Sequence, residues 1–187
     1  FTVAADNFKL IDCEFTEGSA TGVAFIGVGT ADADSDGLVI DRCTFRAPTA
    51  GNYDEAIGIN KDMANVTISN CVIYGDFDEA GIEIPAGGNT CTNLRLINNH
   101  ITNLQAGQHA IQISGTDVTG MCAGNRVQTN AQATAIDPAA LSCFDNLWTD
   151  TDGSNDEEAV PVFGPIAAAD NASNAVGADN NNNAFAS

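Results

Sequence analysis

The sequence predicts an all-β fold: a single-stranded, right-handed parallel β-helix (solenoid) of about six coils with an extended C-terminal tail. Two observations predict it. An eight-residue motif occurs six times between residues 8 and 148, and short segments in which apolar residues alternate with other residues lie between successive copies. Repeats of about 20–50 residues are typical of solenoids. We expect the β-helix to span residues 1–148. Residues 149–187 should form an acidic turn, an extended segment and an Ala/Asn-rich tail that packs on the helix or on a neighbour.

The copies of the repeat motif are separated by 30, 28, 28, 26 and 21 residues. They are Phe8–Phe15, Leu38–Phe45, Val66–Ile73, Leu94–Ile101, Gly120–Val127 and Leu141–Trp148. Between them lie Val23–Phe25, Ile57–Ile59, Ile82–Ile84 and Ile111–Ile113, each apolar at its first and third residues. An alternation of period two indicates a strand whose apolar side chains face inward. Each coil should therefore supply at least two short strands joined by turns rich in Gly, Asn and Asp.

The sixth position of the motif forms a predicted structural ladder. Its members are Cys13, Cys43, Cys71, Asn99, Asn125 and Asn146. Like residues in stacked coils lie at the strand spacing of roughly 4.8 Å, so an Asn side chain can bond to the coils above and below. A Cys fills the same corner apolarly.

The motif and its ladder resemble the pectate-lyase-like superfamily of right-handed parallel β-helices, which carries inward-facing Asn ladders at tight bends. The resemblance covers about three-quarters of the chain and implies the architecture. It does not fix the function, because this fold serves lyases, hydrolases, adhesins and viral spikes. Bacteriophage tail-fibre, tailspike and capsid-decoration proteins contain β-helices of this kind.

The charge balance is strongly acidic. There are 25 acidic and 6 basic residues, for a net charge of −19. Such a surface repels phosphate backbones and anionic lipids, so we expect no nucleic-acid or membrane partner. We also expect the six cysteines to be free thiols, because Cys13, Cys43 and Cys71 form an odd-numbered stack and Cys122 and Cys143 fall at core-facing positions.

Two acidic segments are candidate calcium sites. Asp32, Asp34 and Asp36 alternate before Gly37 as in the first half of a calcium loop, but the twelfth position is Cys43 where an EF-hand has Glu. A second group comprises Asp150, Asp152, Asp156, Glu157 and Glu158. Calcium there would be structural, pinning a loop, and no cofactor is required. The alternative for both segments is a solvated acidic turn.

No catalytic residue is assigned, and the sequence favours a protein that is not an enzyme. A β-helix lyase would use calcium with a Lys or Arg base, and the outward candidates Lys9, Arg95 and Arg126 lie in separate coils. A hydrolase could use paired carboxylates. Glu83 is predicted to point outward, and further acids lie in neighbouring turns: Asp54, Glu55, Asp76, Asp78 and Glu79. His100 and His109 have no identified partners.

Three functions follow from these observations. The first is a non-enzymatic structural or attachment component of a virus particle, such as a phage capsid-decoration protein or a tail-fibre or spike β-helix. It would be extracellular or on the virion surface, and would bind other virion proteins, a surface glycan, or its own copies as a trimer. The second is a secreted polysaccharide lyase or glycoside hydrolase, which loss of activity on changing Glu83 or Arg95 would favour. The third is a bacterial surface adhesin.

Overall fold

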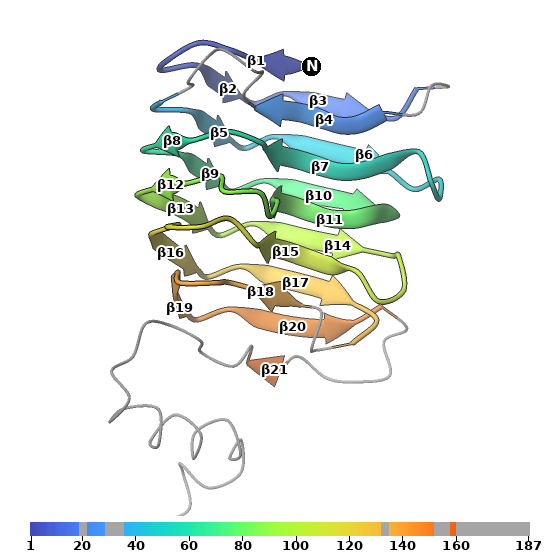
Figure 1. Cartoon of the computed structure of the whole chain (residues 1–187). Helices are drawn as coiled ribbons and strands as arrows, with labels where there is room; N and C mark the ends of the chain where they lie inside the picture. The colour runs from blue at the N-terminus through green and yellow to red at the C-terminus, as the bar shows by residue number, and fades with distance from the viewer. Residues whose placement is uncertain (19–21, 29–35, 132–134, 152–157, 160–187) are drawn as a thin grey trace, which may run out of the picture.

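The computed structural model describes residues 1–18, 22–28, 36–131, 135–151 and 158–159, and every regular element among them is a β-strand. The strands stack coil upon coil, from β1 (Thr2–Val3) at the N-terminal end to β20 (Leu147–Asp150) (Figure 1). Successive coils pair in parallel, and the antiparallel pair of β20 with β21 (Glu158–Ala159) is the exception. The predicted all-β parallel solenoid is therefore confirmed.

Three sheets run along the solenoid, and we call them A, B and C. Sheet A consists of β1, β4 (Gly22–Val28), β7 (Tyr53–Ile59), β11 (Phe77–Ile84), β15 (His109–Ile113) and β18 (Ile136–Asp137). Sheet B consists of β2 (Lys9–Ile11), β5 (Val39–Asp41), β9 (Thr67–Ser69), β13 (Leu94–Ile97), β16 (Gly120–Ala123) and β19 (Ser142–Phe144). Sheet C consists of β3 (Glu14–Thr16), β6 (Thr44–Ala47), β10 (Val72–Gly75), β14 (His100–Asn103), β17 (Arg126–Thr129), β20 and β21. A short pair, β8 (Met63–Ala64) with β12 (Cys91–Thr92), lies between sheets A and B in the chain.

Each copy of the repeat motif forms two strands, one in sheet B and one in sheet C, with a sharp bend between them. The fifth residue of every copy has a positive φ of 52–65°. These residues are Asp12, Arg42, Asn70, Asn98, Gly124 and Asp145. Asn, Asp and Gly tolerate this left-handed conformation best. At the exception, the guanidinium of Arg42 donates hydrogen bonds to the carboxylates of Asp12 and Asp41.

The sixth position of the motif lies just after this bend, where the asparagines bond from coil to coil. The side-chain Oδ1 of Asn146 accepts a hydrogen bond from the backbone N–H of Asn125 at 2.9 Å. The Oδ1 of Asn125 accepts from the N–H of Asn99 at 3.0 Å, and that of Asn99 from the N–H of Cys71 at 3.0 Å. Buried backbone groups at the corner thereby gain partners.

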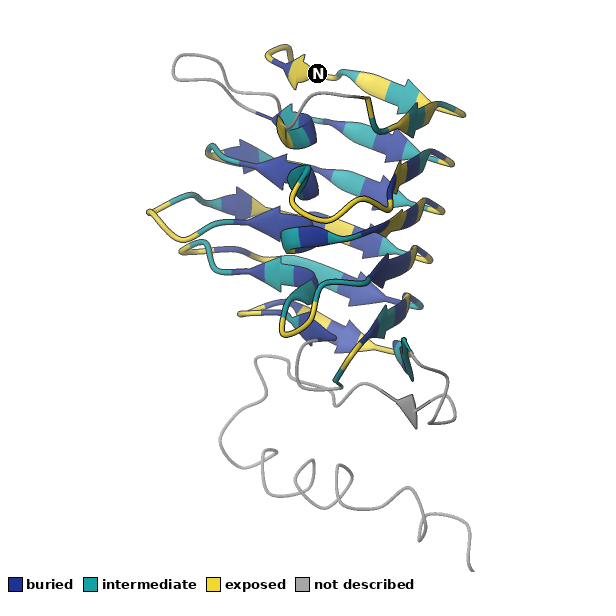
Figure 2. Ribbon diagram, turned by 90° about the vertical axis from the view of Figure 1, so that its right-hand side faces the viewer, coloured by how far each residue is buried: buried dark blue, intermediate teal, exposed yellow. Residues whose placement is uncertain are grey.

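The core lies between the three sheets, with buried and exposed residues alternating along the strands (Figure 2). Phe15 stacks on Phe45 and Phe25 on Tyr53 near the N-terminal end, and isoleucines fill the middle coils. The prediction that Val23 faces the core is wrong, because its side chain is 62% exposed. In the sheet A register, Ile26 and Val28 pair with Ile57 and Ile59 instead.

All six cysteines are free thiols. Most of the predicted tail, residues 149–187, lies outside the described residues. In the part of the chain that the structure describes, no helix is long and apolar enough to cross a membrane.

Candidate functional site

Among the strands, those of sheet A contain acidic residues without basic ones. They contain six acidic residues and no Lys or Arg, and the acids are Asp54, Glu55, Asp78, Glu79, Glu83 and Asp137. The strands of sheets B and C contain four acids and four bases: Asp41, Glu14, Asp150 and Glu158 against Lys9, Arg95, Arg46 and Arg126. The charge is therefore segregated by sheet, and we call the outer side of sheet A the acidic face.

Two glutamates meet in the middle of this face because small residues lie opposite them. Ala56 and Ile57 are consecutive core residues, which leaves Glu55 and Gly58 for the outer side. In the pairing of β7 with β11, Glu55 lies opposite Ala80 and Gly58 opposite Glu83. Neither Ala80 nor Gly58 has a long side chain, so the carboxyl groups of the two glutamates can approach each other across the strands.

Gly58 is required for this arrangement. A Cβ built at position 58 would lie 2.2 Å from Oε1 and 3.0 Å from Cδ of Glu55. Real Cβ atoms do not approach other atoms so closely, so any side chain here would displace the Glu55 carboxylate. Gly58 thus shapes the site without contributing a polar group to it.

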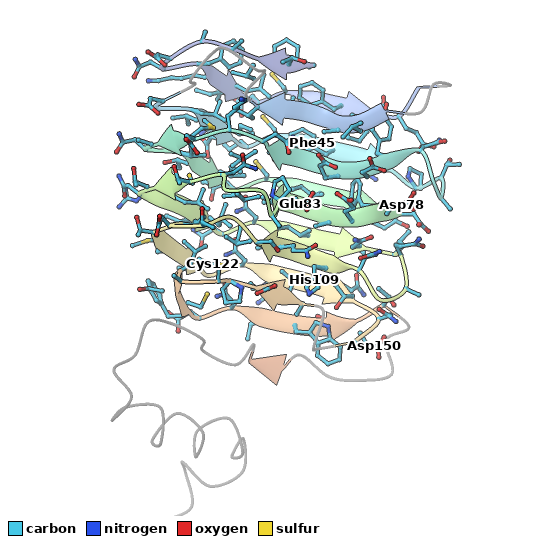
Figure 3. The ribbon with its side chains drawn as sticks, in the orientation of Figure 1. Phe45, Asp78, Glu83, His109, Cys122 and Asp150 are labelled. Carbon is cyan, nitrogen blue, oxygen red and sulfur yellow. The ribbon has the colours of Figure 1, made fainter. Side chains whose placement is uncertain are left out.

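A third glutamate completes the site, which we call the glutamate trio. Carboxylate oxygens of Glu55, Glu79 and Glu83 all lie within 4.8 Å of one another. Glu55 and Glu83 are 2% and 6% exposed, whereas Glu79 is exposed. Oε2 of Glu55 is buried and has no hydrogen-bond partner among the described residues. Figure 3 shows Glu83 near the end of β11, with Asp78 near the start of that strand and His109 on the next coil.

The trio is electrostatically unfavourable when fully ionised. Burial raises the pKa of Glu55 to about 7, and the negative charges of Glu79 and Asp54 add to the effect, against a hydrogen bond from Asn60. Burial likewise raises the pKa of Glu83 to about 8, assisted by its hydrogen bond with Glu79 and by the charges of Glu79, Glu55 and Asp54. Carboxyl groups of this kind are neutralised by a shared proton or by a cation.

Other buried polar atoms without partners among the described residues lie on the coils of the trio or on the coil that follows. Oδ1 of Asp76 and Nδ1 of His109 are buried and have no hydrogen-bond partner among the described residues. Burial raises the pKa of Asp76 and the charge of Asp78 raises it further. Burial lowers the pKa of His109, with the charge of Asp137 acting in the opposite direction. His109 lies opposite Ala80 in the sheet, so it is the neighbour of the trio on the following coil.

The predicted calcium ligands are only partly described. Asp32 and Asp34 lie outside the described residues. Asp36 is exposed, and its Oδ1 accepts a hydrogen bond from the backbone N–H of Ala64 at 2.7 Å. Of the second acidic segment, Asp152, Asp156 and Glu157 are likewise outside the described residues. Both calcium sites therefore stay predictions.

The basic residues considered for a lyase are not near the trio. Lys9 and Arg95 belong to sheet B and Arg126 to sheet C, on other sides of the solenoid from the acidic face. Sequence reasoning named the acids of the trio as neighbours of Glu83, but it did not bring Glu55 and Glu79 to that side chain. The sequence feature that could have indicated the meeting of the glutamates is Gly58, the small residue between Ile57 and Ile59, which leaves room for the Glu55 carboxylate.

Sheet C presents a different surface, which we call the sheet C patch: Arg46, Val72, Tyr74, His100 and Arg126. All five side chains are exposed and belong to four consecutive coils. Arg46 lies beside Tyr74 in one column, and Val72, His100 and Arg126 follow one another in the other. The exposed side chains of the patch recur from coil to coil, and they include a tyrosine and two arginines.

Comparison with protein-family models, with curated proteins and with solved structures finds no match for this chain. The class to which the chain belongs is thus defined by its fold: an all-parallel β-solenoid with one acidic face.

Proposed function

We propose that this chain is a structural or attachment component at the surface of a virus particle, such as a capsid-decoration protein or a β-helix of a tail fibre or spike. The sheet C patch is the observation that carries the proposal. In a chain of net charge −19, this surface combines two arginines, a histidine and two exposed apolar side chains. It is the part of the described surface best suited to contact a partner.

The composition of the patch supports that role. Tyr and Arg are the residues most often found at the energetic centre of protein interfaces, because they combine contact area with hydrogen bonding. Val72 is 41% and Tyr74 36% exposed, both on β10. The same side chains suit a glycan, since Tyr stacks on sugar rings while Arg and His bond to hydroxyls. The partners are a trimer of this chain, other virion proteins or a surface glycan.

The solenoid supports the proposal by its rigidity. Every interior coil is hydrogen-bonded to two others in parallel register, and the Asn corner ties the coils together from within. The patch is therefore presented on a scaffold that holds its columns at the spacing of the strands. The repeat motif and its ladder also resemble the β-helices of phage fibres and spikes.

The test compares the wild-type protein with a variant in which Arg46→Ala and Tyr74→Ala are combined. Light scattering gives the oligomeric state, and a glycan array gives sugar binding. We expect the wild type to form a trimer or to bind a glycan, and the variant to lose that property. Arg95→Ala on sheet B is the matched control, and should behave as the wild type. A wild-type monomer that binds no glycan contradicts two of the three proposed partners and leaves only other virion proteins. A variant that trimerises or binds a glycan as the wild type does contradicts the role of the patch.

A second candidate, a polysaccharide hydrolase, is favoured by the glutamate trio. Retaining glycosidases hold two carboxyl groups about 5–5.5 Å apart, and the general acid needs a raised pKa. The pKa of Glu83 at about 8 meets the second condition. The carboxylate oxygens of the trio, within 4.8 Å of one another, lie slightly closer than the first condition asks. Activity on a panel of acidic polysaccharides, abolished by Glu83→Gln, would establish the enzyme. A panel without turnover would exclude it for those substrates.

A further inference from the structure

The glutamate trio leaves a buried polar atom that the protein itself does not satisfy. Oε2 of Glu55 is enclosed, with the residue only 2% exposed, and no donor in the described structure reaches it. A buried carboxylate oxygen without a donor is costly. The strands of sheet A contain no Lys or Arg that could supply a positive charge. Among the described residues, therefore, none supplies the missing partner.

We propose that Glu55, Glu79 and Glu83 together bind a divalent cation, and that calcium is the ion that the geometry fits best. Three carboxylates converge on the acidic face, and one of them, that of Glu55, has a buried oxygen without a hydrogen-bond partner among the described residues. The site is independent of the sheet C patch, so its failure would leave the proposed attachment function untouched.

The spacing of the oxygens is compatible with calcium, and the irregular arrangement of the ligands favours calcium over magnesium. Two oxygens bound to one calcium ion at about 2.3–2.6 Å each can be up to about 5.2 Å apart. The trio oxygens, within 4.8 Å of one another, satisfy this limit as they stand. Magnesium binds oxygen at about 2.0–2.1 Å, so its ligands are at most about 4.2 Å apart, and it demands near-ideal octahedral geometry. Calcium tolerates the irregular arrangement of three side chains from two strands.

The exposure of the three residues also suits a bound ion. Glu55 and Glu83 form the buried part of the site, and Glu79 forms its exposed part. An ion can enter past Glu79 and keep water molecules on its open side, as calcium sites with few protein ligands do. Asp54 adds negative charge nearby without being part of the trio.

Isothermal titration calorimetry with calcium chloride tests the proposal on the full chain after treatment with a chelator. The buffer holds about 0.15 M NaCl, so that diffuse attraction to the acidic surface is screened. We expect saturable binding at the trio, at least tenfold weaker in Glu55→Gln and in Glu83→Gln. Magnesium should bind more weakly than calcium to the wild type.

Three further variants make the outcome specific. Gly58→Ala keeps every charge but displaces the Glu55 carboxylate, so it should also weaken calcium binding at least tenfold. Glu14→Gln on sheet C removes one exposed carboxylate and should bind as the wild type does. Asp34→Asn tests the predicted calcium loop and should leave the trio site intact. Calcium binding unchanged in Glu55→Gln and Gly58→Ala, with both variants folded by circular dichroism, overturns the proposal.

Discussion

The change Asn125→Ala tests whether the corner ladder holds the coils together. Asn125 is completely buried, and its side chain serves three coils. Its Oδ1 accepts from the backbone N–H of Asn99 at 3.0 Å, and its Nδ2 donates to the carbonyl of Leu96 at 2.9 Å and to Oδ1 of Asn146 at 2.9 Å. Truncation leaves the N–H of Asn99 and the carbonyl of Leu96 buried without these partners.

The expected loss follows from these two groups. Each buried group that loses its partner costs about 1–3 kcal/mol, so Asn125→Ala should lower the free energy of unfolding by about 2–6 kcal/mol. That is a large share of the roughly 5–15 kcal/mol of a typical domain. Asn125→Cys should cost less, because Cys71 occupies the same corner and its thiol lies 3.2 Å from the carbonyl of Ser69 and 3.8 Å from that of Ile40.

Urea unfolding followed by circular dichroism measures the loss, and the dependence on urea shows whether the unfolded state has changed. Ser142→Ala, at an exposed position of the last sheet B strand, is the control and should stay within about 0.5 kcal/mol of the wild type. A loss below about 1 kcal/mol for Asn125→Ala, with an unchanged urea dependence, would refute the view that the ladder stabilises the stack.

Three other predictions concern the acidic face, the glycines and the thiols. The folded-state pKa values of Glu55 (about 7) and Glu83 (about 8) exceed the usual 4.5, so the folded protein holds these protons more tightly than the unfolded chain does. The calcium-free protein should therefore lose on the order of 2 kcal/mol of stability, after allowance for solvent screening, as pH rises from 4.5 to 8. Thermal unfolding measures this dependence, and Glu55→Gln should flatten it. Gly75→Ala should lower the free energy of unfolding in urea by several kcal/mol, because its Cβ would lie 2.5 Å from Phe77 and 2.9 Å from a backbone oxygen. Gly27→Ala, whose Cβ would have nothing within 4 Å, is the control and should be nearly neutral. Equal effects of the two changes would contradict the packing. A thiol reagent followed by mass spectrometry should label half-buried Cys13 first and the five buried cysteines only on unfolding, and simultaneous labelling would show that those thiols are accessible.

The architecture could be predicted from the sequence because the repeat motif recurs with apolar residues at fixed positions. The ladder was predicted to lie at a bend, but the left-handed fifth residue that makes the bend was not identified, because nothing marks Asp12 as left-handed except its residue type. The fifth residue of the second copy is Arg42, which makes the preference for Asn, Asp or Gly at this position harder to recognise. The alignment predicted for β4 was wrong for a related reason, because Val23–Phe25 has the apolar spacing that Ile26 and Val28 provide in the structure.

The glutamate trio and the sheet C patch depend on register between coils, which the sequence does not reveal. Glu55 and Glu83 are 28 residues apart in a chain whose coil lengths vary, and a shift of one residue would place Glu55 on the other side of the sheet. Arg46 lies beside Tyr74 because both follow the bend by the same number of residues. Once the bend is recognised, the patch can be found from the sequence alone.

The recurrence of the corners makes the coil a unit of length. Asn65 and Asn93 have the same left-handed backbone, with φ of 59° and 58°, and each is followed by the first residue of a motif copy. Removing residues 66–93 would join Asn65 directly to Leu94 and recreate the junction that Asn93 makes now. The rod would shorten by one layer of roughly 4.8 Å, with its other layers in register. A protein built in this way can change its reach in discrete steps, and the step that removes this layer also removes Glu79, Glu83 and with them the cation site.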